Sequence, residues 1–513
     1  MTHVSPSRRS RLVATSAAGL LAAAGVVTSV APAAAADPAC DTVDALMDCV
    51  TLAGVEEHLT AFQEIADDNG GNRASGFPGF TASADYVESR LRDAGYDVTR
   101  QPFDFNYYEV VGTPTFARTS SPARAFSYST DGATGDFQDM SYSGSGTVAG
   151  AIVPIDVASA DSGCEAADFP VATDGQVALV KRGTCEFGAK ARNAEAAGFD
   201  GVIIYNDGAD AERTGLINGT LGGPVGIPVL DTTFALGGEL AQAGTTVEIG
   251  IETINKVVST ENVIADLPGR KKHDVVALGA HLDSVPEGAG INDNGTGSAG
   301  ILEVAESLAG VQLENTVRFA WWGAEESGLV GSQHYVDSLA AKELKQISAY
   351  LNFDMIGSPN FARFVYDGDG SDFEAPAGFV SPKSAAIEHL FEEFYDGRGL
   401  LHEDTEFDGR SDYEAFALAG IPTGGLFTGA EGVKTHEQFL RYGGSEGAAF
   451  DPCYHSACDD IDNIDTTVLD ENADAIAYAV MTLANPRGSD HGNGYGSTGN
   501  PGTGQGGGMG ATA

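Results

Sequence analysis

The pattern of apolar and polar residues changes along this chain from helical spacing to continuous apolar runs. From Val55 to Arg92 the pattern has the period of a helix, and the turn-rich stretch NGGNRASGFPG at 69–79 interrupts it, which predicts two helices joined by a loop. From residue 262 onward, short apolar runs alternate with helical stretches such as 298–308 and 384–395. Buried strands joined by helices indicate an α/β fold with a mostly parallel central sheet flanked by helices. The predicted strands are Val275–Gly279, Val317–Trp322, Tyr350–Phe353 and Thr423–Phe427.

A region of different character lies between these two parts. From about residue 101 to residue 252 the chain is rich in short β-type runs, and within it 177–180, 189–197 and 202–205 predict strand, helix and strand. Because 513 residues exceed one ordinary core, we expect two globular units, and this region predicts a second, β-rich α+β unit. We also expect a signal peptide at 1–36 and a disordered Gly-rich tail at 487–513.

The first 36 residues have the pattern of an export signal. Arg8, Arg9 and Arg11 precede an apolar stretch and an alanine-rich cleavage site, so we expect removal near Ala36 and a secreted, extracellular protein. The paired arginines are compatible with the twin-arginine route as well as with general secretion. No other stretch is apolar and long enough to cross a bilayer.

The composition excludes some partners. Without residues 1–36 the chain keeps 25 basic and 73 acidic side chains, a formal charge of −48. Such a chain repels nucleic acid and anionic membrane, and the charge favours solubility outside the cell. We expect a monomer.

The six cysteines form three local couples, and an even number in an exported protein favours disulfides. A cysteine-ligated zinc is the alternative, but no CxxC spacing supports it. The expected pairs are Cys40 with Cys49, Cys164 with Cys185, and Cys453 with Cys458.

Metal-type ligands stand at the ends of the predicted strands and in tight loops. Ligands at the carboxyl ends of parallel strands meet at one edge of a sheet. Each residue alone has an ordinary explanation, such as an Asx-turn for the aspartate in GINDNGTG, but buried carboxylates in one place are costly without cations. Two imidazoles and three carboxylates suit zinc, with Glu325 left over as a base. The ligand candidates are His281, Asp293, Glu326, Asp354 and His455.

One further residue follows from strand alternation. His281 and Asp283 lie on the same side of an extended segment, so the Asp283 carboxylate is expected to accept the imidazole N–H and to orient the ring.

Together these motifs resemble those of the di-zinc aminopeptidases of family M28, the secreted Streptomyces-type enzymes among them. The resemblance covers about residues 55–100 and 260–486, and residues 104–257 resemble an inserted protease-associated (PA) domain. It implies that the α/β peptidase domain is in two parts, the first at 37–103 and the metal-binding part at 258–486, with the inserted domain at 104–257 between them. The motifs are His281-x-Asp283, Asn292-Asp293-Asn294-Gly295, Trp321-Trp322-Gly323-Ala324-Glu325-Glu326, Asn352-Phe353-Asp354-Met355-Ile356-Gly357 and Tyr454-His455-Ser456.

The resemblance implies a role for each residue. Asp293 bridges two zinc ions, His281 and Asp354 complete one site, and Glu326 and His455 complete the other. Glu325 is the general base, and the Tyr454 hydroxyl supports the oxyanion. The pocket residues are Arg410 and Phe427, while Asp470 and Asp474 match calcium ligands whose amino-terminal partners do not align here. Tyr413 stands where relatives often have histidine.

The function implied is hydrolysis of the first peptide bond of peptides with a free amino terminus, with large apolar residues preferred. A carboxypeptidase on the same fold would need a basic cluster for the terminal carboxylate, and only Arg410 is evident. A second alternative implied by the resemblance is a glutaminyl cyclase on the same fold, which works with a single zinc. A non-catalytic binding module, the third, would have lost ligands.

Overall fold

The computed structural model describes residues 40–485 except 131 and 133, so the predicted signal peptide and tail lie outside the described residues. The chain forms two eight-stranded sheets, one in the α/β domain and one in the inserted segment. No helix in the described part is long and apolar enough to cross a membrane.

The first sheet has the strand order β1-β10-β12-β11-β13-β16-β14-β15. Its four central strands are mutually parallel, as the sequence predicts, while β1, β10 and β14 join it in antiparallel fashion. The strands are β1 (Asp97–Val110), β10 (Thr253–Leu267), β11 (Lys271–His281), β12 (Asn315–Trp322), β13 (Ile347–Phe353), β14 (Phe364–Tyr366), β15 (Glu403–Thr405) and β16 (Thr423–Phe427).

The central strands of this sheet are buried on both faces, and successive side chains, which point to opposite sides, enter two different cores. Trp321 belongs to the apolar core that includes residues of α2, α3, α6, α9 and α12, whereas Trp322 belongs to the core shared with α7 and α10. The helices are α1 (Val43–Cys49), α2 (Leu52–Asp68), α3 (Pro78–Asp93), α6 (Gly297–Ser307), α7 (Val330–Ser338), α8 (Ala341–Leu344), α9 (Pro382–Arg398), α10 (Tyr413–Leu418), α11 (His436–Tyr442) and α12 (Thr466–Ala484).

The predicted helix, loop and helix at the start of the domain correspond to α2 and α3. The Thr51 side chain caps α2 by accepting a hydrogen bond from the Gly54 amide at 3.1 Å, and Pro78 begins α3 with its φ already fixed. The turn-rich residues 69–77 between them form a loop in which residues 72–75 are buried.

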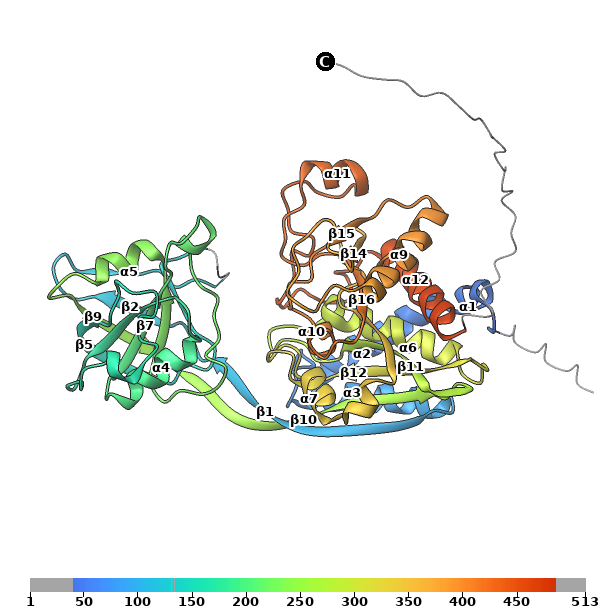
Figure 1. The fold of residues 1–513 in the computed structure, drawn as a ribbon, viewed down its shortest axis with the longest axis horizontal. Helices are drawn as coiled ribbons and strands as arrows, with labels where there is room; N and C mark the ends of the chain where they lie inside the picture. Colours follow the sequence, from blue (N-terminus) through green and yellow to red (C-terminus); the bar gives the residue numbers. More distant parts are fainter. Residues whose placement is uncertain (1–39, 131, 133, 486–513) are drawn as a thin grey trace, which may run out of the picture. The chain divides into compact units, whose positions relative to one another are not determined.

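The inserted segment forms the second sheet, whose order is β3-β2-β9-β5-β6-β7-β8-β4. The strands that lead into and out of it, β1 and β10, pair from Asp97 with Asp266 to Val110 with Thr253, and Figure 1 shows them side by side. Its elements are β2 (Thr115–Arg118), β3 (Arg124–Ala125), β4 (Phe137–Asp139), β5 (Gly146–Pro154), η1 (Ala166–Asp168), β6 (Val177–Lys181), α4 (Phe187–Ala196), β7 (Gly201–Tyr205), η2 (Glu212–Thr214), β8 (Val229–Thr232), α5 (Phe234–Leu240) and β9 (Thr246–Ile251).

All six cysteines are disulfide-bonded, in the three local pairs that the sequence predicts. The pairs are Cys40–Cys49, Cys164–Cys185 and Cys453–Cys458.

Candidate metal centre

The carboxyl ends of three adjacent strands bring the predicted ligands together. His281 is the last residue of β11, Asp354 directly follows β13, and Glu325 and Glu326 come just after β12. Asp293 comes from the irregular turn η3 (Ile291–Thr296) that precedes α6. The sheet therefore supplies most of the side chains, as expected for ligands at the ends of parallel strands.

Asp293 lies between the two histidines. Its Oδ1 is 3.2 Å from Nε2 of His281, and its Oδ2 is 3.3 Å from Nε2 of His455. Asp354 Oδ1 stands 3.3 Å from His281 Nε2, and Glu326 Oε2 stands 3.0 Å from His455 Nε2. The five side chains thus form two groups of three that share Asp293.

These distances suit a small tetrahedral cation in each group. Two ligands about 2.1 Å from one zinc ion are roughly 3.4 Å apart, which is close to the separations found here. Buried oxygens of Glu326 and Asp354, one on each, have no hydrogen-bond partner in the described chain. Unpaired buried carboxylate oxygens are costly, so the donor set and its unused atoms fit two divalent metals.

The pKa values of His281, Asp293 and His455 also indicate that the cluster favours bound positive charge. Burial would lower the pKa of both histidines, but the facing carboxylates outweigh it and raise the pKa of His455 to about 11 and that of His281 well above its usual value. Burial acts to raise the pKa of Asp293, yet hydrogen bonds from both imidazoles hold it below the usual range. The carboxylates thus draw positive charge onto the imidazoles in the absence of metal.

Three residues of this centre have backbone conformations that L-amino acids rarely adopt. Ala324, next to Glu325, has φ of 55°, Met355, next to Asp354, has φ of 64°, and His455 itself has φ of 53°. Such conformations cost on the order of 1–3 kcal/mol each and persist where the surroundings enforce them. The Cys453–Cys458 disulfide encloses His455 and limits how its turn can relax.

Glu325 stands beside the ligand groups and faces the cavity. Its Oε2 is 4.0 Å from His281 Nε2, and its side chain is buried. Burial raises its pKa, and the neighbouring carboxylates of Asp354 and Glu326 raise it further against the opposing effect of His281. A buried carboxylate with a raised pKa is a competent proton acceptor beside a reacting group.

A cavity of about 360 Å³ opens onto these side chains. Apolar rings of Phe364, Phe427 and Phe450 line it, and Arg410 and Tyr454 belong to its wall. The Tyr454 ring stacks on the His455 imidazole with centroids 3.9 Å apart, and its hydroxyl lies 3.5 Å from Arg410 Nη2. Arg410 also pairs with Glu431 at 2.7 Å, so the predicted pocket arginine has a carboxylate partner of its own.

Asp283 supports the centre differently from the sequence prediction. The Nδ1 atom of His281 bonds the backbone carbonyl of Asp283 at 2.9 Å, while the nearest carboxylate oxygen is 3.8 Å away. That carboxylate instead accepts the amide N–H of Glu325 at 3.2 Å. Because the chain turns after β11, the backbone carbonyl of Asp283 faces Nδ1 of His281, where strand alternation predicts the carboxylate.

Several supporting residues were not predicted from the sequence. Asp459 accepts the amide N–H groups of Asn292 and Asp293 at 2.8 and 3.0 Å, and the Ser411 hydroxyl donates to Asp354 at 2.5 Å. Arg73 binds the segment after His281. Asp459 has one visible signal, its place in CYHSACDD four residues after His455, whereas nothing local to Arg73 or Ser411 indicates their contacts.

The remaining predicted residues lie elsewhere or have other partners. Asp470 and Asp474 lie on α12, and Asp474 pairs with Arg398 at 3.3 Å. The Tyr413 hydroxyl donates to Asp408 at 2.8 Å and accepts from the Gly409 amide at 2.9 Å. Tyr413 thus holds the 408–409 turn, and Asp408 belongs to the cavity wall.

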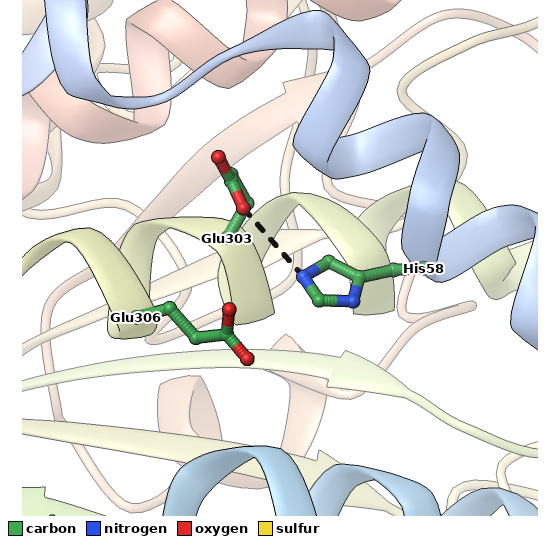
Figure 2. A group of neighbouring side chains, drawn as sticks. All are labelled: His58, Glu303 and Glu306. Atoms are coloured by element: carbon green, nitrogen blue, oxygen red, sulfur yellow. Dashed lines mark ion pairs between the residues drawn. The ribbon is translucent and has the colours of Figure 1, made fainter. Parts of the chain in front are cut away.

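A second group of metal-type side chains lies between α2 and α6, as Figure 2 shows. The ligand atoms of His58, Glu303 and Glu306 lie within 4.8 Å of one another, and His58 Nε2 is 3.6 Å from Glu303 Oε2. Arg90, however, donates from Nε and Nη2 to both oxygens of Glu306 at 2.6 and 2.7 Å. An internal guanidinium already supplies the positive charge here.

The fold and the centre together define a class, the metallopeptidases of mostly parallel α/β fold with an inserted domain. Comparison with known proteins identifies the family. The model of Peptidase family M28 matches residues 262–480, and the model of the PA domain matches residues 145–240. Over 444 residues the chain is 47% identical to an aminopeptidase of Pseudomonas aeruginosa strain UCBPP-PA14, covering 85% of this chain and 81% of that protein.

Two further similarities agree. The chain is 41% identical over 442 residues to leucine aminopeptidase 2 of Trichophyton equinum, covering 84% and 83% of the two chains. Its fold matches a zinc aminopeptidase from Bacillus subtilis with a TM-score of 0.57 and 26% identity, covering 85% of this chain and 96% of that one. This chain belongs to peptidase family M28, has a PA domain and is a metallo-aminopeptidase that acts on peptides.

Proposed function

We propose that this protein is an exported di-zinc aminopeptidase that releases large apolar residues from the amino terminus of peptides. The observation that carries the proposal is the position of Asp293, whose two oxygens face two different imidazoles at 3.2 and 3.3 Å. A carboxylate placed in this way can bridge two metal ions. His281 and Asp354 would hold one zinc, and Glu326 and His455 the other.

Zinc, when bound, acidifies water and polarises the carbonyl of the scissile bond. Glu325 has no place in either three-residue group with Asp293, so its carboxylate is available to take a proton from the attacking water and pass it to the leaving amine. The Tyr454 hydroxyl, beside His455 at the cavity wall, would donate to the oxygen that becomes negative. Carboxylates such as Glu325 and Asp354 would hold the substrate's free ammonium group.

The proposed preference for apolar residues rests on the cavity wall. Phe364 and Phe427 stack with centroids 5.9 Å apart, and Phe450 meets Phe364 edge to face at 5.3 Å. A bulky apolar side chain buries area against these rings, at about 25 cal/mol per Å². The leucine aminopeptidase of Trichophyton equinum is consistent with this preference.

Export, the domain boundaries and calcium complete the proposal. Three disulfides suit an oxidising compartment, which supports removal of residues 1–36 on the way out of the cell. We place the inserted domain at 104–257 and expect the mature chain to act as a monomer. Calcium would bind Asp470 and Asp474, in competition with the pairing of Asp474 to Arg398.

Metal content and substrate choice test the proposal together. The purified mature protein should contain two zinc ions per chain, and a chelator should abolish cleavage of leucyl-nitroanilide until zinc is restored. The same substrate with a blocked amino group, and glycyl-nitroanilide, should both be poor substrates. One metal per chain, activity that survives chelation, or equal cleavage of the blocked substrate would contradict the proposal.

A further inference from the structure

Arg73 is a fully buried arginine whose donors all serve one short segment. It lies in the loop between α2 and α3, with its guanidinium 5.0 Å from the centre of the Phe62 ring. Nε donates to the carbonyl of Ala289 at 2.8 Å, Nη2 donates to the carbonyl of Gly290 at 2.6 Å, and Nη1 donates to the carbonyl of Leu282. The guanidinium thus joins the two ends of segment 282–290.

This segment connects two proposed metal ligands. It begins directly after His281 and ends three residues before Asp293, so its shape fixes how far apart these two side chains stand. The backbone of Arg73 is held to the same segment, because its N–H donates to Ser284 Oγ at 2.9 Å. Without the guanidinium, three buried carbonyls would lose a donor.

The charge of Arg73 is also unusual for a buried position. Burial lowers its pKa to about 10, and the acids Asp459, Asp283, Asp293 and Glu326 oppose that effect, so the side chain stays protonated at neutral pH. Among the described residues no carboxylate forms a salt bridge with it, and its directed bonds go to the carbonyls. The hydrogen bonds of Arg73 therefore serve to hold segment 282–290.

We propose that Arg73 is a positioning residue that sets the separation of His281 and Asp293, and through it the affinity of the centre for divalent metal. The inference rests on the proposed function, because it takes these two residues as ligands of one ion. Arg73 acts through backbone carbonyls and reaches neither substrate nor metal. Its loss should weaken metal binding while leaving substrate binding unchanged in the metal-loaded enzyme.

The test uses the metal-free mature protein titrated with cobalt(II), whose visible absorption reports the geometry around the ion. Arg73→Met should weaken cobalt binding about 10- to 100-fold, the range found for residues that support metal ligands. Arg73→Lys, which keeps the charge but has a smaller donor group, should give a smaller loss. With excess metal, both variants should show the wild-type KM.

Arg318→Met is the matched control. Arg318 is also a largely buried arginine of the α/β domain, but it donates to Asp266 at 2.7 and 2.6 Å and to the Tyr335 hydroxyl at 2.6 Å. Its loss should lower the melting temperature and leave cobalt affinity unchanged. A general loss of stability would change the melting temperature and cobalt affinity of Arg73→Met and Arg318→Met alike. Only a loss of cobalt affinity that is selective for Arg73→Met supports the inference.

The failures can be told apart. If wild-type protein shows no saturable cobalt binding, the proposed metal centre itself is wrong and the inference fails with it. If the wild type binds cobalt and the Arg73 variants bind it equally well with the same spectrum, Arg73 has no positioning role. Should Arg73→Met not fold, Arg73→Lys and Ser284→Ala decide, and wild-type affinity in both would overturn the inference.

Discussion

Two clusters of histidine and carboxylate side chains in this protein differ in the source of their positive charge. Between α2 and α6, Arg90 donates to both oxygens of Glu306, and Thr51 donates from its amide and hydroxyl groups to Glu303 at 3.3 Å each. At the ends of β11, β12 and β13, no lysine or arginine of the described chain pairs with Asp293, Glu326 or Asp354. Among residues that the structure describes, the only positive partners there are imidazoles.

The difference shows why similar residues have different uses. Buried carboxylates need a compensating charge, and a guanidinium built into the fold provides a permanent one. A cluster that lacks one depends on ions from outside, which is the condition for a metal centre. A third solution appears on β8, where the buried Asp231 has neither cation nor metal-type neighbours in its hydrogen bonds, and burial instead raises its pKa to about 7 and so favours the uncharged form.

The largest effect should come from Glu325→Gln. This change keeps the size of the side chain but removes the proton acceptor, so kcat should fall by about 10²- to 10⁴-fold. Because Glu325 is outside the two groups that share Asp293, zinc content should stay at the wild-type level. The measurement is kcat with leucyl-nitroanilide together with the zinc content of the same preparation.

Glu406→Gln is a suitable control for this variant. Glu406 is an exposed acid of the cavity wall, so its change alters the charge near the substrate without removing the proposed base. A fall in kcat of equal size in both variants, or an unchanged kcat in Glu325→Gln, would contradict the role of Glu325.

The positions of the proposed metal ligands could be predicted from the sequence because they depend on regular structure. Continuous apolar runs predicted β11, β12 and β13, and the parallel arrangement placed the residues that follow them at one edge. His281, Glu326 and Asp354 are accordingly close together in the structure. The helices α6 and α9 likewise match the predicted helical stretches to within a few residues.

The supporting residues could not be predicted, because their partners are backbone groups distant in sequence. Arg73 and the carbonyl of Leu282 are 209 residues apart, and a carbonyl is present at every position, so no side-chain pattern marks the pair. The Asp283 carbonyl replaces its carboxylate as the partner of His281 for the same reason, since strand alternation describes side chains only.

Arg90→Met should have an intermediate effect, on stability and not on catalysis. It leaves Glu306 without its cation, and although breaking a buried pair can cost 3–5 kcal/mol, partial exposure of both side chains reduces the expected loss to about 1–2 kcal/mol. The melting temperature should fall by a few degrees while zinc content and KM stay the same.

Arg92→Met on the same helix is the control. The partner of Arg92 is Glu88 in an exposed i,i+4 pair, so this change should alter the melting temperature little. An Arg90 variant as stable as this control would show that Glu306 needs no cation.

The smallest effect should be that of Asp231→Asn, and it should depend on pH. Burial raises the pKa of Asp231 to about 7, above its ordinary value of 3.8, so the folded protein favours the protonated form. The contribution of Asp231 to the free energy of unfolding is therefore greatest at acid pH and is lost as the pH rises through about 7. Asp231→Asn avoids this loss because an amide does not ionise. Relative to wild type, Asp231→Asn should melt at nearly the same temperature at pH 4 and a few degrees higher at pH 8, where an unpaired buried charge costs about 1–3 kcal/mol. Comparison at each pH removes effects shared by both proteins, such as loss of metal in acid, and Asp174→Asn provides an exposed control in the same domain. If the difference in melting temperature between Asp231→Asn and wild type is the same at pH 4 and pH 8, burial does not raise the pKa of Asp231. Protonation is then not how the fold accommodates this buried acid.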